Sequence, residues 1–203
     1  MSQWFLRGIK KGIKTEKNFK DKYKPYYPSK LEGKSDYNCP VNAIKNGEWD
    51  ENKCIYCGKC DLNPTKDEKI YKINDAMPEM FKKSFYIYPL DSGTCGACNA
   101  EFNSIFYPQY DANRFKIFLS NTPRHADALL LMGVYTENMH DVIKNAYDAM
   151  PDPKVIIGFG SCALTGGIIG SSINEKFNVE IAGCPPSPYT IISAILKYKG
   201  DIK

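Results

Sequence analysis

The second half of the chain alternates short apolar runs with stretches of helical pattern. The apolar runs have the length and the side chains of buried strands. Residues 138–150 carry the spacing of a helix, and a closing helix is expected over 190–198. This rhythm predicts an α/β fold with a mostly parallel sheet covered by helices on both faces. The expected strands are 85–90, 115–119, 128–132 and 155–159.

The first third of the chain follows another pattern. Phe5, Ile9 and Ile13 recur every four residues among basic residues, which predicts a short amphipathic helix that packs on its own domain or lies on a partner or membrane surface. Residues 39–64 are polar and poor in aliphatic side chains, so a metal site must organise them. We therefore expect a basic arm at 1–34, a metal-organised module with its connector at 35–83, and a main domain at 84–203.

Positive charge is concentrated in the arm. Residues 1–34 hold ten Lys or Arg against three Asp or Glu, a net charge of +7, whereas the whole chain of 203 residues carries +4. The arm has no recognised nucleic-acid-binding motif, so an acidic partner, lipid headgroups or simple solvation explain its charge better than nucleic acid does. No signal peptide or membrane span is expected, because the apolar start gives way to lysines after a few residues.

All eight cysteines fall into two sets of four. Four disulfides would suit a short secreted chain, whereas thiolates that bind metal suit a reducing cytoplasm. Four thiolates are what a [4Fe-4S] cube needs, one for each iron corner. The sequence therefore predicts two [4Fe-4S] clusters. The first set is Cys39, Cys54, Cys57 and Cys60, and the second is Cys95, Cys98, Cys162 and Cys184.

The first set resembles one half of a two-cluster bacterial ferredoxin. Cys54, Cys57 and Cys60 form a Cys-x2-Cys-x2-Cys run, and Cys39 with the proline after it matches the fourth ligand that such proteins take from the opposite half. The ligands of the other ferredoxin cluster are missing, because no Cys-x2-Cys-x2-Cys run precedes Cys39 and no Cys-Pro pair follows Cys60 where one is expected. A structural zinc site is the alternative, although zinc ribbons usually pair two Cys-x2-Cys knuckles.

The second set is spread over about ninety positions, so the fold must assemble its site. Cys95 and Cys98 form a Cys-x2-Cys pair, and Glu101 follows three residues later. Cys162 and Cys184 each follow within two residues of a glycine, which would let the backbone approach a cluster closely. Between these motifs lies the sequence Thr-Pro-Arg-His-Ala-Asp at 122–127.

With these four motifs in this order, residues 84–198 closely resemble the small, cluster-bearing subunit of energy-converting [NiFe] hydrogenases and its homologue in respiratory complex I. The resemblance implies a flavodoxin-like domain that carries one [4Fe-4S] cluster and no flavin, with the second cysteine set as its ligands. The complex I branch has two adjacent cysteines, whereas Cys95 and Cys98 are separated by two residues, as in the hydrogenase branch. This chain departs from most members by carrying the ferredoxin-like module as its own extension.

The resemblance also implies a role. The chain would be an electron-transfer subunit without an active site of its own, relaying electrons between soluble ferredoxin and a catalytic large subunit that holds a NiFe centre. It would be a peripheral part of a membrane-bound complex on the cytoplasmic side. The alternative is a quinone- or sulfur-reducing relative whose large subunit lacks nickel. Glu101, Arg124 and His125 are candidates for tuning the second cluster or contacting the large subunit, although His125 also suits an ordinary turn.

Overall fold

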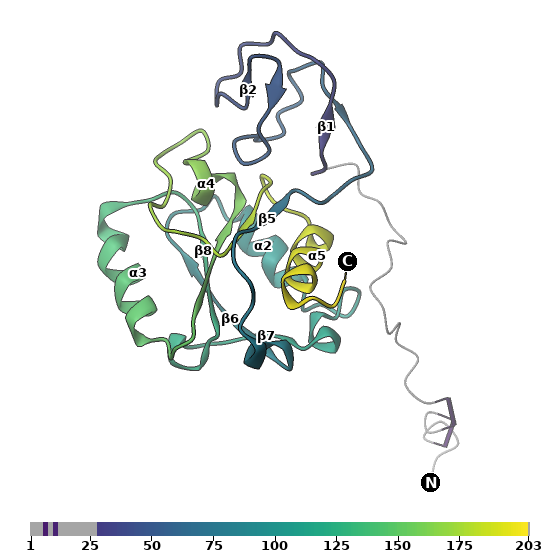
Figure 1. Ribbon diagram of the computed structural model, residues 1–203, viewed down its shortest axis with the longest axis vertical. Coiled ribbons are helices and arrows are strands. Elements are labelled where there is room, and N and C mark those ends of the chain that lie inside the picture. The colour runs from purple at the N-terminus through teal and green to yellow at the C-terminus, as the bar shows by residue number, and fades with distance from the viewer. Residues whose placement is uncertain (1–5, 8–9, 12–27, 203) are drawn as a thin grey trace.

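The computed structural model describes residues 6–7, 10–11 and 28–202, and its largest feature is a six-stranded sheet (Figure 1). The strands are β5 (Tyr71–Ile73), β6 (Phe85–Asp91), β7 (Ile117–Leu119), β8 (Ala128–Met132), β9 (Val155–Phe159) and β10 (Val179–Ile181). They lie in the order β5-β10-β9-β8-β6-β7. Neighbouring strands are parallel except β5, which runs antiparallel to β10 at the edge.

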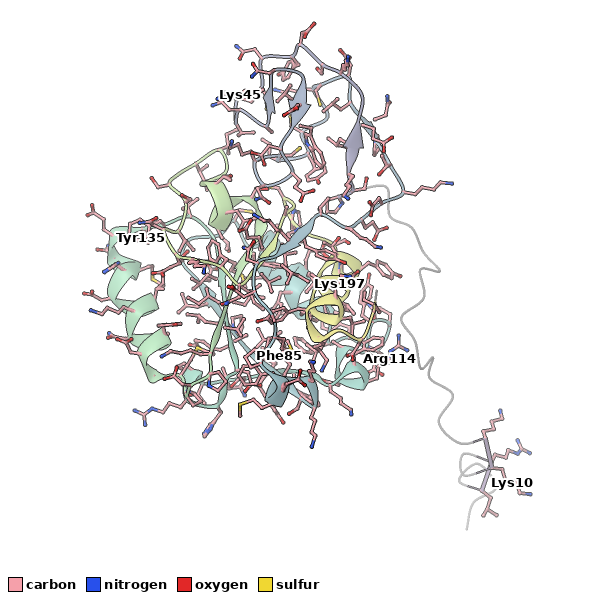
Figure 2. All side chains as sticks on the ribbon, in the orientation of Figure 1. Lys10, Lys45, Phe85, Arg114, Tyr135 and Lys197 are labelled. Atoms are coloured by element: carbon pink, nitrogen blue, oxygen red, sulfur yellow. The ribbon has the colours of Figure 1, made fainter. Side chains whose placement is uncertain are left out.

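The central strand β8 shows how the sheet buries both of its faces. Successive side chains of a strand point to opposite faces. Accordingly Ala128, Leu130 and Met132 pack into one apolar cluster, and Leu129 and Leu131 pack into another. Side chains fill the space between the sheet and its helices (Figure 2). The first cluster includes residues of α2 (Ala97–Ser104) and α5 (Pro188–Lys199), and the second includes residues of α3 (Glu137–Ala149) and α4 (Gly160–Thr165).

Residues 28–70 form a smaller unit beside α4 and β5 (Figure 1). Two short antiparallel pairs shape it, β1 (Leu31–Glu32) with β4 (Asn63–Pro64) and β2 (Ile44–Lys45) with β3 (Glu48–Trp49). Its buried core consists of Leu31, Ala43, Cys54 and Leu62. This core is small, in keeping with the polar sequence. We call residues 28–70 the N-terminal module.

The connections between strands contain three 3-10 helices: η1 (Glu79–Lys82), η2 (Ala112–Phe115) and η3 (Pro123–His125). The connector that carries η1 is fastened to α5, because the buried amine of Lys199 donates a hydrogen bond of 2.9 Å to the carbonyl of Lys82. Within the described residues, no helix is both long and apolar enough to cross a membrane.

The sheet and its flanking helices confirm the predicted α/β class. β8 and β9 have the predicted bounds, and α3 and α5 lie within two residues of theirs. β7 begins at 117 rather than 115, because the residues before it form η2. The ferredoxin-like character of the N-terminal module stays a prediction. Of the predicted basic helix, residues 6–7 and 10–11 are helical, and the rest of 1–27 lies outside the described residues.

Candidate metal centres

The first cysteine set lines a single cavity in the N-terminal module. All four members, Cys39, Cys54, Cys57 and Cys60, contribute to its walls, together with apolar side chains such as Leu31 and Trp49. Cys39 comes from the segment between β1 and β2, and the other three come from the loop between β3 and β4. The two antiparallel pairs therefore bring the distant cysteine to the cavity that the close-spaced run also lines.

The loop that carries the close-spaced cysteines turns through left-handed backbone. Tyr56 has φ 53° and Gly58 has φ 67°, and both lie between cysteines of the run. This turn lets the amide of Tyr56 donate to the sulfur of Cys54 over 3.4 Å. The ring of Trp49 packs edge-on against that of Tyr56, with centroids 6.3 Å apart. Burial raises the pKa of the Cys54 thiol, and the N–H groups of Trp49 and Tyr56 oppose that effect.

The second set is assembled at the carboxyl edge of the sheet. Cys95 and Cys98 follow β6, Cys162 lies in α4 directly after β9, and Cys184 follows β10. Neighbouring parallel strands end at the same edge, which is where α/β folds place their functional groups. The strand register supports this placement. Met132 of β8 pairs with Asp91 at the end of β6 and with Phe159 at the end of β9, so the three strands end at the same level.

The sulfurs of the second set lie close enough to influence one another. Burial raises the pKa of the Cys98 thiol to about 12, and the charges of Cys162, Cys184 and Cys95 add to the rise. Burial also raises the pKa of Cys184, with contributions from Cys162 and Cys95. Four such thiols cannot all ionise side by side without a cation among them. The donor set therefore suits a multivalent metal centre, which would hold the sulfurs as thiolates.

Two glycines bring the backbone against these sulfurs. A Cβ on Gly160 would lie 2.8 Å from the Cys98 sulfur, and one on Gly167 would lie 2.9 Å from the Cys162 sulfur. Real Cβ atoms almost never come so close to another heavy atom. Both positions have positive φ, 82° and 57°. Any side chain here would thus displace a cysteine sulfur.

An aspartate that sequence reasoning missed anchors the Cys95 loop. Asp91 ends β6, and its carboxylate accepts hydrogen bonds from the amides of Gly93 and Thr94, the Thr94 hydroxyl and the Asn99 side chain, all at 2.6–2.8 Å. Burial alone would raise the pKa of Asp91, but these hydrogen bonds outweigh it and lower the pKa. The carboxylate thereby fixes both ends of the segment that holds Cys95 and Cys98.

The other predicted residues fall on opposite edges of the sheet. Glu101 lies in α2 and lines a cavity of about 400 Å³ that also contacts Cys184 and Tyr56. Burial raises the pKa of the Glu101 carboxyl. Arg124 and His125 are exposed in η3, which precedes β8 and so lies at the amino edge. The structure therefore brings Glu101 to the second cysteine set and leaves Arg124 and His125 apart from it.

The two cysteine sets adjoin each other. The charge of Cys54, from the first set, contributes to the raised pKa of Cys184. Hydrogen bonds join the N-terminal module to the main domain at this place, including one from the Ser161 hydroxyl to the Cys54 carbonyl. Thr165 and Glu180 make further contacts to Asn52. No role was predicted from the sequence for the residues that make these contacts.

Neither cysteine set is arranged around one ion. Within residues 28–202, no group of three or more His, Cys, Asp or Glu side chains has the geometry to hold a single metal ion. In a cube, each thiolate binds its own iron corner, so the four sulfurs do not share one point.

Comparison with known proteins places residues 95–198 in the family described as NADH ubiquinone oxidoreductase, 20 Kd subunit. Subunit 7 of formate hydrogenlyase from Escherichia coli is 36% identical over 132 residues, which cover 61% of this chain and 52% of that protein. The chain thus spans about half the length of this relative.

Two further relatives are matched over most of their length. The probable membrane-bound hydrogenase subunit mbhJ of Pyrococcus furiosus is 30% identical, over 66% of this chain and 85% of its own. A subunit of the NADH-quinone oxidoreductase from Pelobacter propionicus is 36% identical, over 60% and 77%. Among solved structures, a chain of the archaeal membrane-bound sulfane sulfur reductase aligns with a TM-score of 0.47 and 29% identity, covering 60% of this chain and 71% of that one.

Proposed function

Because this chain belongs to the family of the 20 kDa subunit of NADH:ubiquinone oxidoreductase, we propose that it is an electron-transfer subunit of an energy-converting [NiFe] hydrogenase. It would relay single electrons between ferredoxin and a NiFe large subunit through two [4Fe-4S] clusters. The observation that carries the proposal is the gathering of all eight cysteines into two adjoining four-thiol sites.

Each site suits a cluster in its donor chemistry. Both provide four thiols, and no competing carboxylate or imidazole ligand is needed. In the first site, the amide of Tyr56 points at the Cys54 sulfur, a type of contact that tunes cluster potential. In the second, Gly160 and Gly167 leave room for the sulfurs of Cys98 and Cys162. When bound, a cluster supplies a carrier of one electron at a time.

The hydrogenase assignment depends on the spacing in the second site. Cys95 and Cys98 are separated by two residues, the hydrogenase-like arrangement, whereas the complex I branch has adjacent cysteines. The alternative function keeps the relay but exchanges the partner for a quinone- or sulfur-reducing large subunit without nickel. The similarity to a subunit of NADH-quinone oxidoreductase supports the quinone-reducing form of this alternative.

The first site would be the one that faces ferredoxin. Cys57 is exposed, and the neighbouring Lys59 is exposed as well, which would suit an acidic soluble donor such as ferredoxin. The second set would face the large subunit from the carboxyl edge of the sheet. The chain would be peripheral to the membrane and on the cytoplasmic side, where a reducing environment keeps thiols available for metal.

The proposal is tested first by metal content. The full chain, purified without oxygen, should contain about eight irons and as much acid-labile sulfide, as two cubes require. A colourless protein with zinc and no sulfide would end the redox proposal. Four irons would mean that one cysteine set holds no cluster.

The partner is tested on the native complex. The complex isolated through this chain should contain nickel and should evolve hydrogen from reduced ferredoxin. A complex without nickel that instead reduces a quinone or sulfur compound would replace the hydrogenase assignment with the alternative.

A further inference from the structure

The buried hydroxyl of Ser161 lies between the two cysteine sets. Ser161 is 1% exposed and directly precedes Cys162. Its Oγ is 2.9 Å from the carbonyl oxygen of Cys54 and 3.2 Å from that of Gly183, the residue before Cys184. One side chain therefore touches the backbone at, or next to, ligands from both sites.

The hydroxyl proton belongs to the bond with Cys54. A serine hydroxyl has one proton and so donates one hydrogen bond at a time. The Gly183 carbonyl already accepts from the backbone N–H of Ser161 at 2.9 Å. The carbonyl of Cys54 is also the nearer of the two oxygens. The Oγ–H of Ser161 thus donates to Cys54, while its N–H donates to Gly183.

Other contacts place the two sites side by side at this point. Tyr56, two residues after Cys54, lines the same cavity as Cys184. One turn further along α4, the Thr165 hydroxyl donates to the carbonyl of Ser161 at 2.9 Å and lies 3.3 Å from the carbonyl of Asn52. The Ser161 contact is therefore part of an interface, and among these hydrogen bonds it is the one that reaches a cysteine.

We propose that Ser161 is a positioning residue for electron transfer between the two sites, holding the Cys54 backbone against the segments of Cys162 and Cys184. This inference rests on the proposed function. One electron leaves the first site and one arrives at the second, so the former is oxidised and the latter reduced by one electron. No bond is formed and no proton moves. The hydrogen bond shortens the path by replacing a gap between two chain segments with a direct contact.

The test compares Ser161→Ala with Thr165→Val in the full chain loaded with both clusters. Ser161→Ala removes the contact with Cys54. Thr165→Val keeps the side-chain shape and removes a hydroxyl that contacts the carbonyls of Ser161 and Asn52, but it leaves the Ser161 hydroxyl and its bond to Cys54 in place. The first site is reduced rapidly, and freeze-quench EPR then follows the appearance of the reduced signal of the second. Iron content and the midpoint potentials of both sites are measured on the same samples.

We expect Ser161→Ala to slow transfer several-fold while iron content stays at the parental value. The potentials should stay unchanged as well, since the lost bond goes to a carbonyl and not to a sulfur. Thr165→Val should transfer at the parental rate. A parental rate in Ser161→Ala, or equal slowing in both variants, would overturn the inference.

Two further outcomes are decisive. If Ser161→Ala fails to hold both clusters, Ser161→Thr, which keeps the hydroxyl, should restore both the clusters and the rate. Failure of Ser161→Thr to do so would overturn the role of the hydroxyl.

In the parent protein, the two reduced clusters should interact magnetically. Two reducible clusters without interaction would overturn this inference alone, whereas a parent chain without iron would overturn the proposed function itself.

Discussion

The side-chain amide of Asn52 donates a hydrogen bond of 3.0 Å to the carboxylate of Glu180, across 128 positions of sequence. Asn52 lies two residues before Cys54, and Glu180 lies in β10, four residues before Cys184. The other oxygen of the same carboxylate accepts from Asn74 at 2.8 Å. The N-terminal module is thereby tied to the strand that leads into the second cysteine site.

Removing this tie should loosen the N-terminal module. Asn52→Ala deletes one hydrogen bond, worth about 1 kcal/mol, which corresponds to a roughly fivefold higher population of the open state. Hydrogen–deuterium exchange of residues 28–70 should rise accordingly, while exchange in β8 and β9 stays at the parental level. Asn121→Ala, at an exposed position before η3, serves as the control. Equal protection in Asn52→Ala and the parent would show that the bond does not hold the module.

Gly160→Ala and Gly200→Ala form a matched pair at the second site. Both glycines have φ near 80°, 82° and 79°, so both variants carry a backbone cost of about 1–2 kcal/mol. A new Cβ on Gly160 meets the Cys98 sulfur at 2.8 Å, whereas one on Gly200 meets nothing within 4 Å. We expect Gly160→Ala to lose the second cluster and Gly200→Ala to keep both, as read from iron per chain. If both variants lost iron, the loss would come from the strained backbone conformation and not from the contact with the Cys98 sulfur.

Single ligand changes should separate the two sites. Cys57→Ser should lower the iron content from about eight to about four per chain and leave the spectrum of the second cluster. Cys162→Ser should do the reverse. Each site draws all four thiols from its own part of the chain, so neither should need the other to assemble. Loss of all iron in either variant would contradict two separate sites.

The anchoring role of Asp91 predicts a defined pH dependence. Its lowered pKa means that the ionised carboxylate stabilises the fold above the unfolded-state pKa of roughly 3.9, and that this contribution is lost as pH falls through the lower folded-state value. The Cys95 loop should therefore remain protected from exchange at pH 5 as at pH 7. Asp91→Asn cannot accept from both Thr94 and Asn99 as the carboxylate does, so the loop should exchange faster at both pH values. A loop that is equally protected in the variant would remove Asp91 from this role.

The local pattern of apolar and polar residues was sufficient to predict the two central strands and the two longest helices. β8 and β9 are buried along their whole length, and each coincides with a continuous apolar run in the sequence, so their bounds were predicted correctly. β5 and β10 were missed because each has three residues with a charged side chain at its centre, Lys72 and Glu180, and so lacks the apolar run that marks the equally short β7. α2 was missed because only Cys98 and Phe102 are buried among eight mostly polar or small residues.

The family was also readable from the sequence, since the predicted resemblance over 84–198 is confirmed by the family match over 95–198. Local spacing marks the first cysteine set, whereas the second set spans about ninety positions and was assigned from the resemblance to the family. The contacts between the sets have no such signature. Ser161 and Asn52 are ordinary polar residues in the sequence, and their importance comes from tertiary packing that joins segments more than one hundred positions apart.

β5 completes one edge of the main sheet. Tyr71–Ile73 lies before the predicted start of the main domain, yet it pairs along the whole of β10. A shortened chain that begins at Ser84 would leave the backbone donors and acceptors of β10 exposed at the sheet edge, and such an edge is a template for self-association. A truncation meant to isolate the main domain should therefore begin before Tyr71, so that β5 still covers this edge of the sheet.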